Sequence, residues 1–288
     1  MEDIRKIKVT LKSRSTIEGA GVRLKRAFGY ADPSLDPFLL LDDFHSDDPN
    51  DYIAGFPWHP HRGIETITYM LHGRIEHGDS LGNGGVIGAG DVQWMTAGSG
   101  IIHQEMPKKD KKDTLLWGFQ LWANLPASHK MMDPRYRDIR KDQIPETFLN
   151  DNEIKIKVIC GEINGIKGPV QDIVTDPEYL DITLNPDSQY IHSVKKGHNV
   201  FTYIIEGEGF FDDNKEELVS KEMLVIFGDG NGVKITTNKE RVRLLLISGK
   251  PLRESVAWRG PIVMNTEEEL RIAFEEYHNK TFIKYHNK

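Results

Sequence analysis

The chain has 288 residues, and its 37 Lys and Arg against 44 Asp and Glu leave a net charge of −7 at pH 7 with His counted as neutral. This charge disfavours direct binding to the nucleic-acid backbone. The content of 38% hydrophobic and 28% charged residues is typical of a globular protein and excludes disordered, collagen-like and coiled-coil chains. The length suffices for about two domains.

The single cysteine, Cys160, can form no disulfide within the chain, which favours a reducing compartment. The longest apolar runs, such as residues 38–41 and 244–247, are far shorter than the roughly 20 residues of a membrane span. The first residues, MEDIR, are charged and lack the apolar centre of a signal peptide. We therefore expect a soluble, cytoplasmic protein that binds no membrane, and we expect it to be a monomer.

Short β-branched and aromatic runs dominate the sequence, separated by Gly, Pro, Asn and Asp at intervals of about ten residues. This pattern is typical of an all-β sandwich or barrel. In chain order, the expected strands are Ile64–Leu71, Val92–Thr96, Leu116–Ala123, Lys155–Cys160, Val200–Ile205, Met223–Phe227 and Val242–Ile247.

One helix is predicted after the last of these strands. Thr266 can cap its first turn together with Glu269, three residues later. An apolar stripe then follows at the spacing i, i+3, i+4, i+7. Its members are Leu270, Ala273, Phe274 and Tyr277.

A weak internal repeat predicts two barrels of the same design. The segment TYMLHG at residues 68–73 is echoed by TYIIEG at residues 202–207. Each segment is predicted to form a strand that is followed by a glycine turn. A second pair, DVQWMT at residues 91–96 and EMLVIF at residues 222–227, follows the first at a comparable distance.

The boundary between the two barrels is expected in the polar stretch of residues 131–152. Pro134 and Pro145 interrupt regular structure there. We predict a first barrel over residues 1–135 and a second barrel with the C-terminal helix over residues 136–288.

Two pairs of polar residues have matched spacing, His59 with His61 and His103 with Glu105. Residues i and i+2 of a strand point to the same face, so each pair can present two ligands to one barrel interior. Three imidazoles and one carboxylate suit a divalent transition metal such as iron, copper, nickel, manganese or zinc, and they leave coordination positions open for catalysis. An isolated His-x-His is usually accidental, but two such pairs favour a metal site.

Other candidates have simpler explanations. Asp79, Ser80 and Asn83 lie in a glycine loop, where turn formation alone accounts for them, and a role facing the substrate is the less favoured alternative. Arg62 follows the first ligand pair and should point to the opposite face, which favours a structural role. Four aromatic residues are expected mainly in the core, with one or two of them lining a pocket for a flat ligand. They are Phe44, Trp58, Trp94 and Phe119.

The motifs around these residues resemble those of the pirin family within the cupin superfamily. The resemblance covers nearly the whole chain. It rests on residues 56–66 (FPWHPHRGIET), 77–83 (HGDSLGN), 90–98 (GDVQWMTAG), 120–126 (QLWANLP) and 260–266 (GPIVMNT).

The resemblance implies two tandem cupin (jelly-roll) barrels with a C-terminal helix. It further implies one metal ion per chain, usually iron, held in the first barrel by His59, His61, His103 and Glu105. The activity it implies is quercetinase-like, that is, a dioxygenase that cleaves a flavonol or another enolic aromatic substrate with dioxygen. Glu105 would then also act in catalysis, taking a proton from the substrate hydroxyl.

The same resemblance allows a different class of function. Vertebrate pirins are described as iron-containing, redox-responsive cofactors that act through a protein partner in transcription. We rank this alternative below the enzyme, because the sequence has no basic groove for direct DNA contact.

The second repeat is expected to bind no metal. Aligning Thr68 with Thr202 and Asp91 with Glu222 places other residue types at the four ligand positions. They are Ser193, Lys195, Lys234 and Thr236. Two ammonium groups there would repel a divalent cation. We interpret the nearby His192 and His198 as solvated or packing residues.

Overall fold

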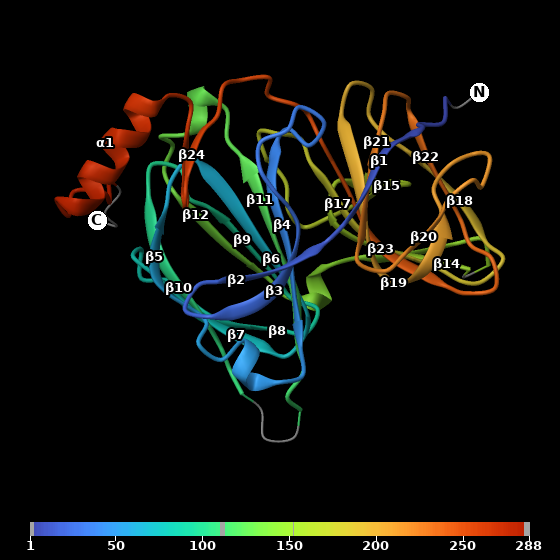
Figure 1. Ribbon diagram of the computed structural model, residues 1–288, viewed down its shortest axis with the longest axis horizontal. Helices are drawn as coiled ribbons and strands as arrows, with labels where there is room; N and C mark the ends of the chain where they lie inside the picture. The colour runs from blue at the N-terminus through green and yellow to red at the C-terminus, as the bar shows by residue number, and fades with distance from the viewer. Residues whose placement is uncertain (1–2, 110–112, 152, 285–288) are drawn as a thin grey trace. The chain divides into compact units, whose positions relative to one another are not determined.

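The computed structural model describes residues 3–109, 113–151 and 153–284 (Figure 1). Almost all regular structure within these ranges is antiparallel β-sheet, as the sequence pattern predicts. The chain divides into two compact units. Barrel 1 contains Arg14–Ala31, Phe38–Lys141 and the chain from Arg253 onward, and barrel 2 contains the chain up to Ser13, Asp32–Pro37 and Asp142–Leu252.

Barrel 1 is built from two sheets. In sheet order, the seven-stranded sheet consists of β12 (Arg135–Ile139), β9 (Val92–Thr96), β6 (Ile64–His72), β11 (Leu116–Asn124), β4 (Phe38–Ser46), β3 (Val22–Gly29) and β2 (Arg14–Glu18). The four-stranded sheet consists of β5 (Phe56–His61), β10 (Ile101–Pro107), β7 (Arg74–Asp79) and β8 (Gly84–Gly88). Short 3-10 turns lie at Pro49–Asp51 and Ala127–His129.

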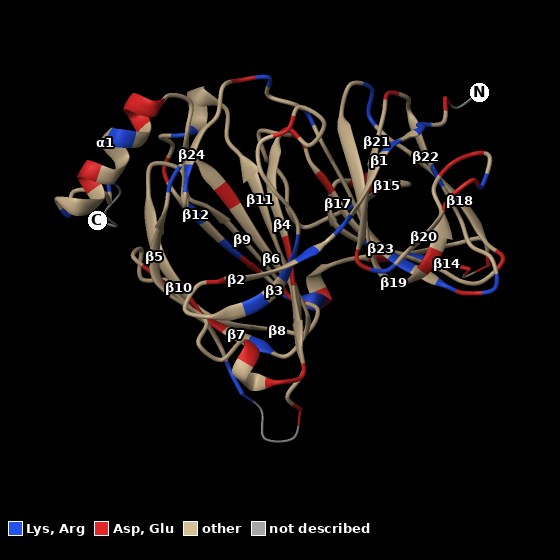
Figure 2. Cartoon of the chain, viewed as in Figure 1, with Lys and Arg blue, Asp and Glu red and all other residues tan. Residues whose placement is uncertain are grey.

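The end of the chain completes barrel 1. A hairpin of β24 (Ala257–Arg259) and β25 (Ile262–Met264) precedes helix α1 (Glu267–His278). Thr266 and Glu269 form the predicted capping box, which satisfies backbone N–H groups at the helix start. Leu270 and Ala273 are buried, whereas Tyr277 is 39% exposed, so the apolar stripe is narrower than expected. Figure 2 shows the acidic first turn of this helix.

Barrel 2 contains one large sheet and a small hairpin. The main path is β1 (Ile7–Lys12), β21 (Met223–Phe227), β19 (Asn199–Phe210), β23 (Val242–Gly249), β17 (Glu178–Leu184), β14 (Ile154–Cys160) and β13 (Glu146–Leu149). The remaining strands are β18 (Gln189–Ser193), β20 (Leu218–Ser220), β22 (Gly232–Thr236), β15 (Glu162–Ile163) and β16 (Ile166–Lys167). A 3-10 turn lies at Lys141–Gln143.

The core of barrel 2 follows from period-two alternation along its strands. On β14, Ile154, Ile156 and Val158 are fully buried, while Lys155 and Lys157 lie on the other face. Burying each such aliphatic side chain contributes roughly 1.5–3 kcal/mol. The core is therefore large and needs no bound ion for its stability.

The two units are not continuous in sequence. The chain passes from barrel 1 to barrel 2 between Lys141 and Asp142, inside the polar stretch that contains Pro134 and Pro145. Strands β12 and β13 each begin directly after one of these prolines. Strand β1 belongs to barrel 2 and the segment from Arg253 belongs to barrel 1, whereas the sequence analysis placed each terminus with the nearer repeat.

No helix in the described part of the chain is both long enough and apolar enough to cross a membrane.

Candidate metal centre

Three histidines converge inside barrel 1. Strands β5 and β10 are antiparallel neighbours, with His59 directly opposite His103 and His61 opposite Ile101 (Figure 1). One ring nitrogen from each of His59, His61 and His103 lies within 4.8 Å of the other two. Within the described residues, this is the one such cluster of three or more His, Cys, Asp or Glu side chains. The sequence spacing had predicted this convergence.

Backbone carbonyls fix the orientation of two of these imidazoles. His59 Nδ1 lies 2.8 Å from the Pro57 carbonyl oxygen, and His61 Nδ1 lies 3.0 Å from the Pro261 carbonyl oxygen. A carbonyl oxygen only accepts, so both Nδ1 atoms carry the proton. Whenever both rings are neutral, both Nε2 atoms bear lone pairs, and these atoms face each other at 3.1 Å. Two facing lone pairs repel each other unless a cation lies close to both.

His103 provides a second, independent feature that suits a bound cation. Both of its ring nitrogens are buried and lack a hydrogen-bond partner among the described residues. A buried polar atom without a partner costs about 1–3 kcal/mol, so a ligand at this position would relieve a real penalty. Burial, reinforced by the neighbouring histidines, lowers the pKa of His61 and His103 well below the ordinary value. Both rings are therefore neutral near pH 7, as metal coordination requires.

Glu105 lies on the same strand as His103, two residues further on, and is 6% exposed. A register shift in the pairing of β10 with β5 separates the two residues, so Glu105 is opposite Phe56. Its Oε1 accepts a hydrogen bond of 2.9 Å from Thr68 Oγ1. Glu105 lines the same cavity as His59 and His61, although its carboxylate is outside the close group of imidazole nitrogens.

His77 was not predicted as part of this site. It lies opposite Glu105 on β7, and its ring centroid is 5.4 Å from that of His103 and 4.7 Å from that of Tyr136. His77 Nε2 is 3.4 Å from Asp79 Oδ2. His77 could have been found in the sequence as part of a third i, i+2 pair of polar residues, with Asp79, next to a glycine turn.

Asp79 itself has the turn role that the sequence favours. Its side chain accepts hydrogen bonds from the backbone N–H groups of Leu81 and Asn83 and from the side chain of Asn83. Although burial raises the pKa of Asp79, hydrogen bonds from His77, Asn83 and Leu81 hold it below the ordinary value. An ionised Asp79 thus closes the loop that follows β7.

A cavity of about 1000 Å³ leads to the histidines and lies entirely within barrel 1. This volume is at the upper end of the range of about 300–1,000 Å³ for small-molecule sites. Tyr30 and five Phe or Trp side chains contribute to its wall. The Phe and Trp residues are Phe44, Phe56, Trp58, Trp122 and Trp258.

Of the four aromatic residues singled out in the sequence, two line this cavity. Phe44 and Trp58 are in its wall, and Trp58 is 53% exposed. Trp94 and Phe119 are buried in the core instead. Trp122, which the sequence analysis did not single out, contacts the imidazole of His61 edge to face, with ring centroids 5.0 Å apart.

The cavity wall carries more carboxylates than cations. Its arginine, Arg26, forms two 2.8 Å hydrogen bonds to Asp42 and a 2.8 Å ion pair with Glu18. Burial raises the pKa of Asp42 to about 6, although the hydrogen bonds from Arg26 lower it. Because Arg26 is already neutralised, it is a poor anchor for an anionic ligand.

Arg62 ties the C-terminal segment to the strand that carries the ligand pair. It is 2% exposed, and its guanidinium donates to the carbonyl oxygens of Ser99 and Phe282, each at 2.8 Å. It also forms a 2.8 Å ion pair with Glu276 on α1. Arg62 therefore has the structural role that its position after the ligand pair predicts.

The Arg62→Met variant should lower the free energy of unfolding by about 2–4 kcal/mol, because two buried carbonyls lose a charged donor. Urea unfolding of both proteins measures the difference. Arg271→Met is the matched control, since its ion pairs with Glu268 and Glu275 are on the exposed face of α1. That control should unfold like the wild type, and an equal loss in both variants would contradict a special role for Arg62.

Comparison with known proteins places this architecture in one family. The family profile described as Pirin matches residues 21–123, and the Pirin C-terminal cupin domain matches residues 179–283. The chain is 42% identical to Pirin-like protein 2 of Arabidopsis thaliana, over 91% of this chain and 80% of that protein. It is 38% identical to human Pirin, over 97% of this chain and 94% of that protein.

The chain belongs to the pirin family. The prediction of two tandem cupin domains followed by a helix is thereby confirmed. Among solved structures, quercetin 2,3-dioxygenase from Acinetobacter baumannii is similar, with a TM-score of 0.90 and 30% sequence identity. The match covers 97% of this chain and 98% of that chain.

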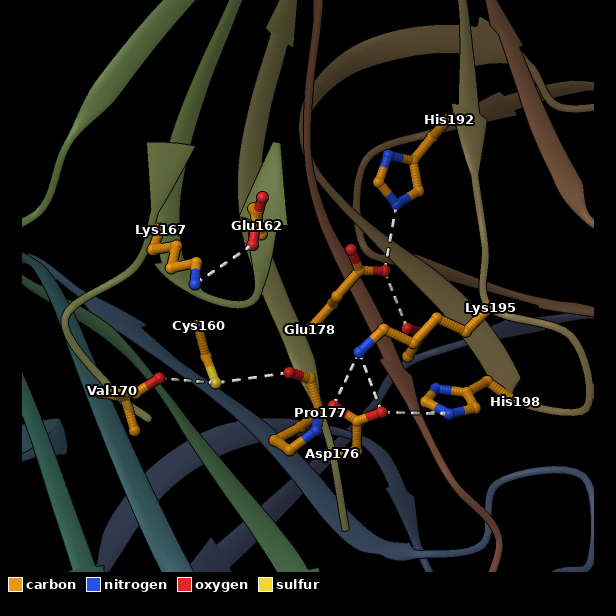
Figure 3. Close-up of polar contacts among 11 residues, drawn as sticks. Cys160, Glu162, Lys167, Val170, Asp176, Pro177, Glu178, His192, Lys195 and His198 are labelled. Carbon is orange, nitrogen blue, oxygen red and sulfur yellow. Dashed lines mark hydrogen bonds and ion pairs between the residues drawn. The ribbon is translucent and has the colours of Figure 1, made fainter. Parts of the chain in front are cut away.

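Barrel 2 contains polar clusters of a different kind (Figure 3). His192 is buried, and its Nε2 lies 3.1 Å from Glu178 Oε2, which also accepts a 3.0 Å hydrogen bond from Ser248. Lys195 contacts both carboxylate oxygens of Asp176, at 2.7 and 2.8 Å. These side chains are thus already paired with one another.

The strand pairing corrects part of the repeat alignment. In barrel 2, Lys234 is opposite Ile191. In barrel 1, the residue aligned with Lys234 is His103, and it is opposite His59. The repeat alignment, however, matched His59 with Ser193. The alignment is therefore offset by two residues on one strand, because a gap-free comparison ignores differences in loop length. Neither Ile191 nor Lys234 is a metal ligand at neutral pH.

One tightly bound ion per chain is the stoichiometry that we expect of this pirin. The histidine cluster is in barrel 1, and Lys234 in barrel 2 is already paired with Asp213 at 2.8 Å. Elemental analysis after removal of loosely held ions measures the ratio. Two tight ions per chain, with the second retained when His61 is replaced by Ala, would contradict this division between the barrels.

Proposed function

We propose that this pirin is a metal-dependent dioxygenase whose metal ion is bound by His59, His61, His103 and Glu105. The observation that carries the proposal is the pair of Nε2 lone pairs facing each other at 3.1 Å, beside a buried His103 whose ring nitrogens have no partner in the described structure. Such donors fit a divalent transition ion of borderline softness. We place iron first among copper, nickel, manganese and zinc.

The bound ion would supply Lewis acidity and a redox-active centre for dioxygen. The residues of the protein would orient the ligands and accept the proton. The carbonyls of Pro57 and Pro261 keep both Nε2 lone pairs directed inward. Trp122 packs edge to face on His61 and restricts its ring. Glu105, as a buried carboxylate at the cavity wall, would complete the ligand set and accept a proton from the substrate hydroxyl.

A flat, uncharged aromatic substrate with hydroxyl groups, such as a flavonol or another enolic compound, is the class that the cavity favours. Aromatic walls stack on a flat ring. Carboxylates accept hydrogen bonds from ligand hydroxyl groups, and the neutralised Arg26 offers little to an anion. The activity of the similar Acinetobacter baumannii enzyme, named for quercetin, agrees with this class.

The proposed reaction consumes dioxygen, opens the oxygen heterocycle of the flavonol and releases carbon monoxide. To test it, anaerobic protein loaded with ferrous or cupric ion is mixed with quercetin, and we expect a spectral shift on binding. Readmission of air should then consume oxygen and release carbon monoxide. No turnover with any of several metals would contradict the proposal and favour the redox-responsive regulatory role, with a protein partner instead of a substrate.

A further inference from the structure

A short chain of hydrogen bonds crosses the interior of barrel 1 and ends on Glu105. Gln120 Nε2 donates to Thr68 Oγ1 at 3.0 Å, and Thr68 Oγ1 donates to Glu105 Oε1 at 2.9 Å. Gln120 on β11 is directly opposite Thr68 on β6 in the seven-stranded sheet. Glu105 is on β10 of the four-stranded sheet, so the second bond joins the two sheets across the cavity.

The direction of this chain follows from the number of protons available. A hydroxyl group carries a single proton, whereas a side-chain amide nitrogen only donates. The Thr68 hydroxyl has two acceptors within reach, Glu105 Oε1 at 2.9 Å and Gln120 Oε1 at 3.4 Å. The shorter, charge-assisted bond to Glu105 is the stronger one, and Gln120 Nε2 donates to the Thr68 oxygen, so the hydroxyl proton is directed to Glu105. Thr68 is 2% exposed, so no bulk water competes for that bond. One carboxylate oxygen of Glu105 is thereby held by Thr68, and the other oxygen can bind a different partner.

We propose that Thr68 is a positioning residue that fixes the carboxylate of Glu105 for metal binding, with Gln120 setting the direction of the Thr68 hydroxyl. This inference rests on the proposed function, in which Glu105 is a ligand. A glutamate whose side-chain torsions are free loses rotational freedom when its carboxylate coordinates an ion, and a prior hydrogen bond reduces that loss. Thr68 acts only through Glu105 and contacts neither ion nor substrate in this scheme.

The decisive variant is Thr68→Val, which has nearly the same shape and lacks the hydroxyl. We expect its affinity for Co²⁺, measured by competition with a coloured chelator, to fall about 10–100-fold, as is usual when a partner of a metal ligand is lost. The visible spectrum of bound Co²⁺ should change as well. Thr68→Ser, which keeps the hydroxyl, should retain most of the affinity, and Gln120→Leu should show part of the loss.

Thr66→Val provides a matched control. Thr66 is on the same strand and the same face, is buried, and its hydroxyl has no hydrogen-bond partner in the described structure. This variant should bind Co²⁺ like the wild type. An equal loss of affinity in Thr66→Val and Thr68→Val would mean that packing on β6 is responsible, and would overturn the proposal.

A double-mutant cycle with Glu105→Ala, which removes both the ligand oxygen and the acceptor of the Thr68 bond, separates the positioning role from a structural one. If Thr68 acts through Glu105, Thr68→Val should cause little further loss once Glu105 has been replaced. A full additional loss in that background would overturn the inference. If Glu105→Ala weakens Co²⁺ binding but Thr68→Val does not, the inference fails while Glu105 remains a ligand. If neither does, the proposed ligand set itself is wrong.

Discussion

The His61→Ala variant should retain no metal and show no oxygenase activity, while the protein remains folded. His61 supplies one of the two facing Nε2 lone pairs. Without it, the close group of imidazole nitrogens is reduced to His59 and His103, and Glu105 lies outside that group, so we expect tight binding to be lost. The apolar cores of both barrels do not depend on the ion. Elemental analysis, oxygen uptake and thermal melting measure the three parts of this prediction.

The melting temperature of His61→Ala should match that of chelator-treated wild-type protein, since both lack only the stabilisation that comes from ion binding. His72→Ala is a suitable control, because His72 is exposed at the end of β6. This control should keep its metal and its activity. Melting of His61→Ala far below the chelator-treated wild type would show that His61 holds the fold itself, for example through its bond to Pro261.

Replacement of Glu105 by Gln should reduce turnover by roughly a hundredfold or more, the usual size of a lost general base. The amide keeps an oxygen for the ion and can still accept the bond from Thr68, but it has no useful basicity near neutral pH. Metal content should therefore be partly retained. Turnover is measured as oxygen consumed per metal-loaded protein, so that a lower occupancy is not counted as slower chemistry.

Glu76→Gln is the control for this experiment, because Glu76 is on the neighbouring strand β7 and is half exposed beside Lys108. It should leave turnover unchanged. If Glu105→Gln turned over at the wild-type rate with full metal occupancy, Glu105 would have no part in proton transfer. It could then serve only as a ligand.

Local patterns in the sequence predicted most of the strands well. Val92–Thr96 and Met223–Phe227 have the predicted bounds, and the capping box at Thr266 correctly marks the start of α1. The assignment of the chain ends to the two barrels could not be predicted in the same way. The pairing of β1 with β21 joins residues more than 200 positions apart, and periodicity carries no information on such partners.

The candidate site shows the same limit. The i, i+2 spacing of His59 and His61 was sufficient to place both rings on one face of a strand. The partners that orient those rings were not predictable, since the Pro261 carbonyl is a backbone atom that any residue could supply. Thr68 was missed for a related reason, because a threonine within an apolar strand ordinarily indicates β propensity and nothing more.

The hydrogen bond between His61 and the Pro261 carbonyl joins residues that are 200 positions apart, so it cannot form until most of the chain has been synthesised. During synthesis the histidine pairs emerge early, yet the hairpin that orients His61 follows only after the whole of barrel 2 has been translated. A ribosome-bound chain that ends before residue 261 therefore presents His61 without its final tautomer constraint, whereas His59 can already be oriented by the Pro57 carbonyl. If the proposed ion binds through all three imidazoles, we therefore expect stable binding only in chains that have been translated almost to the end.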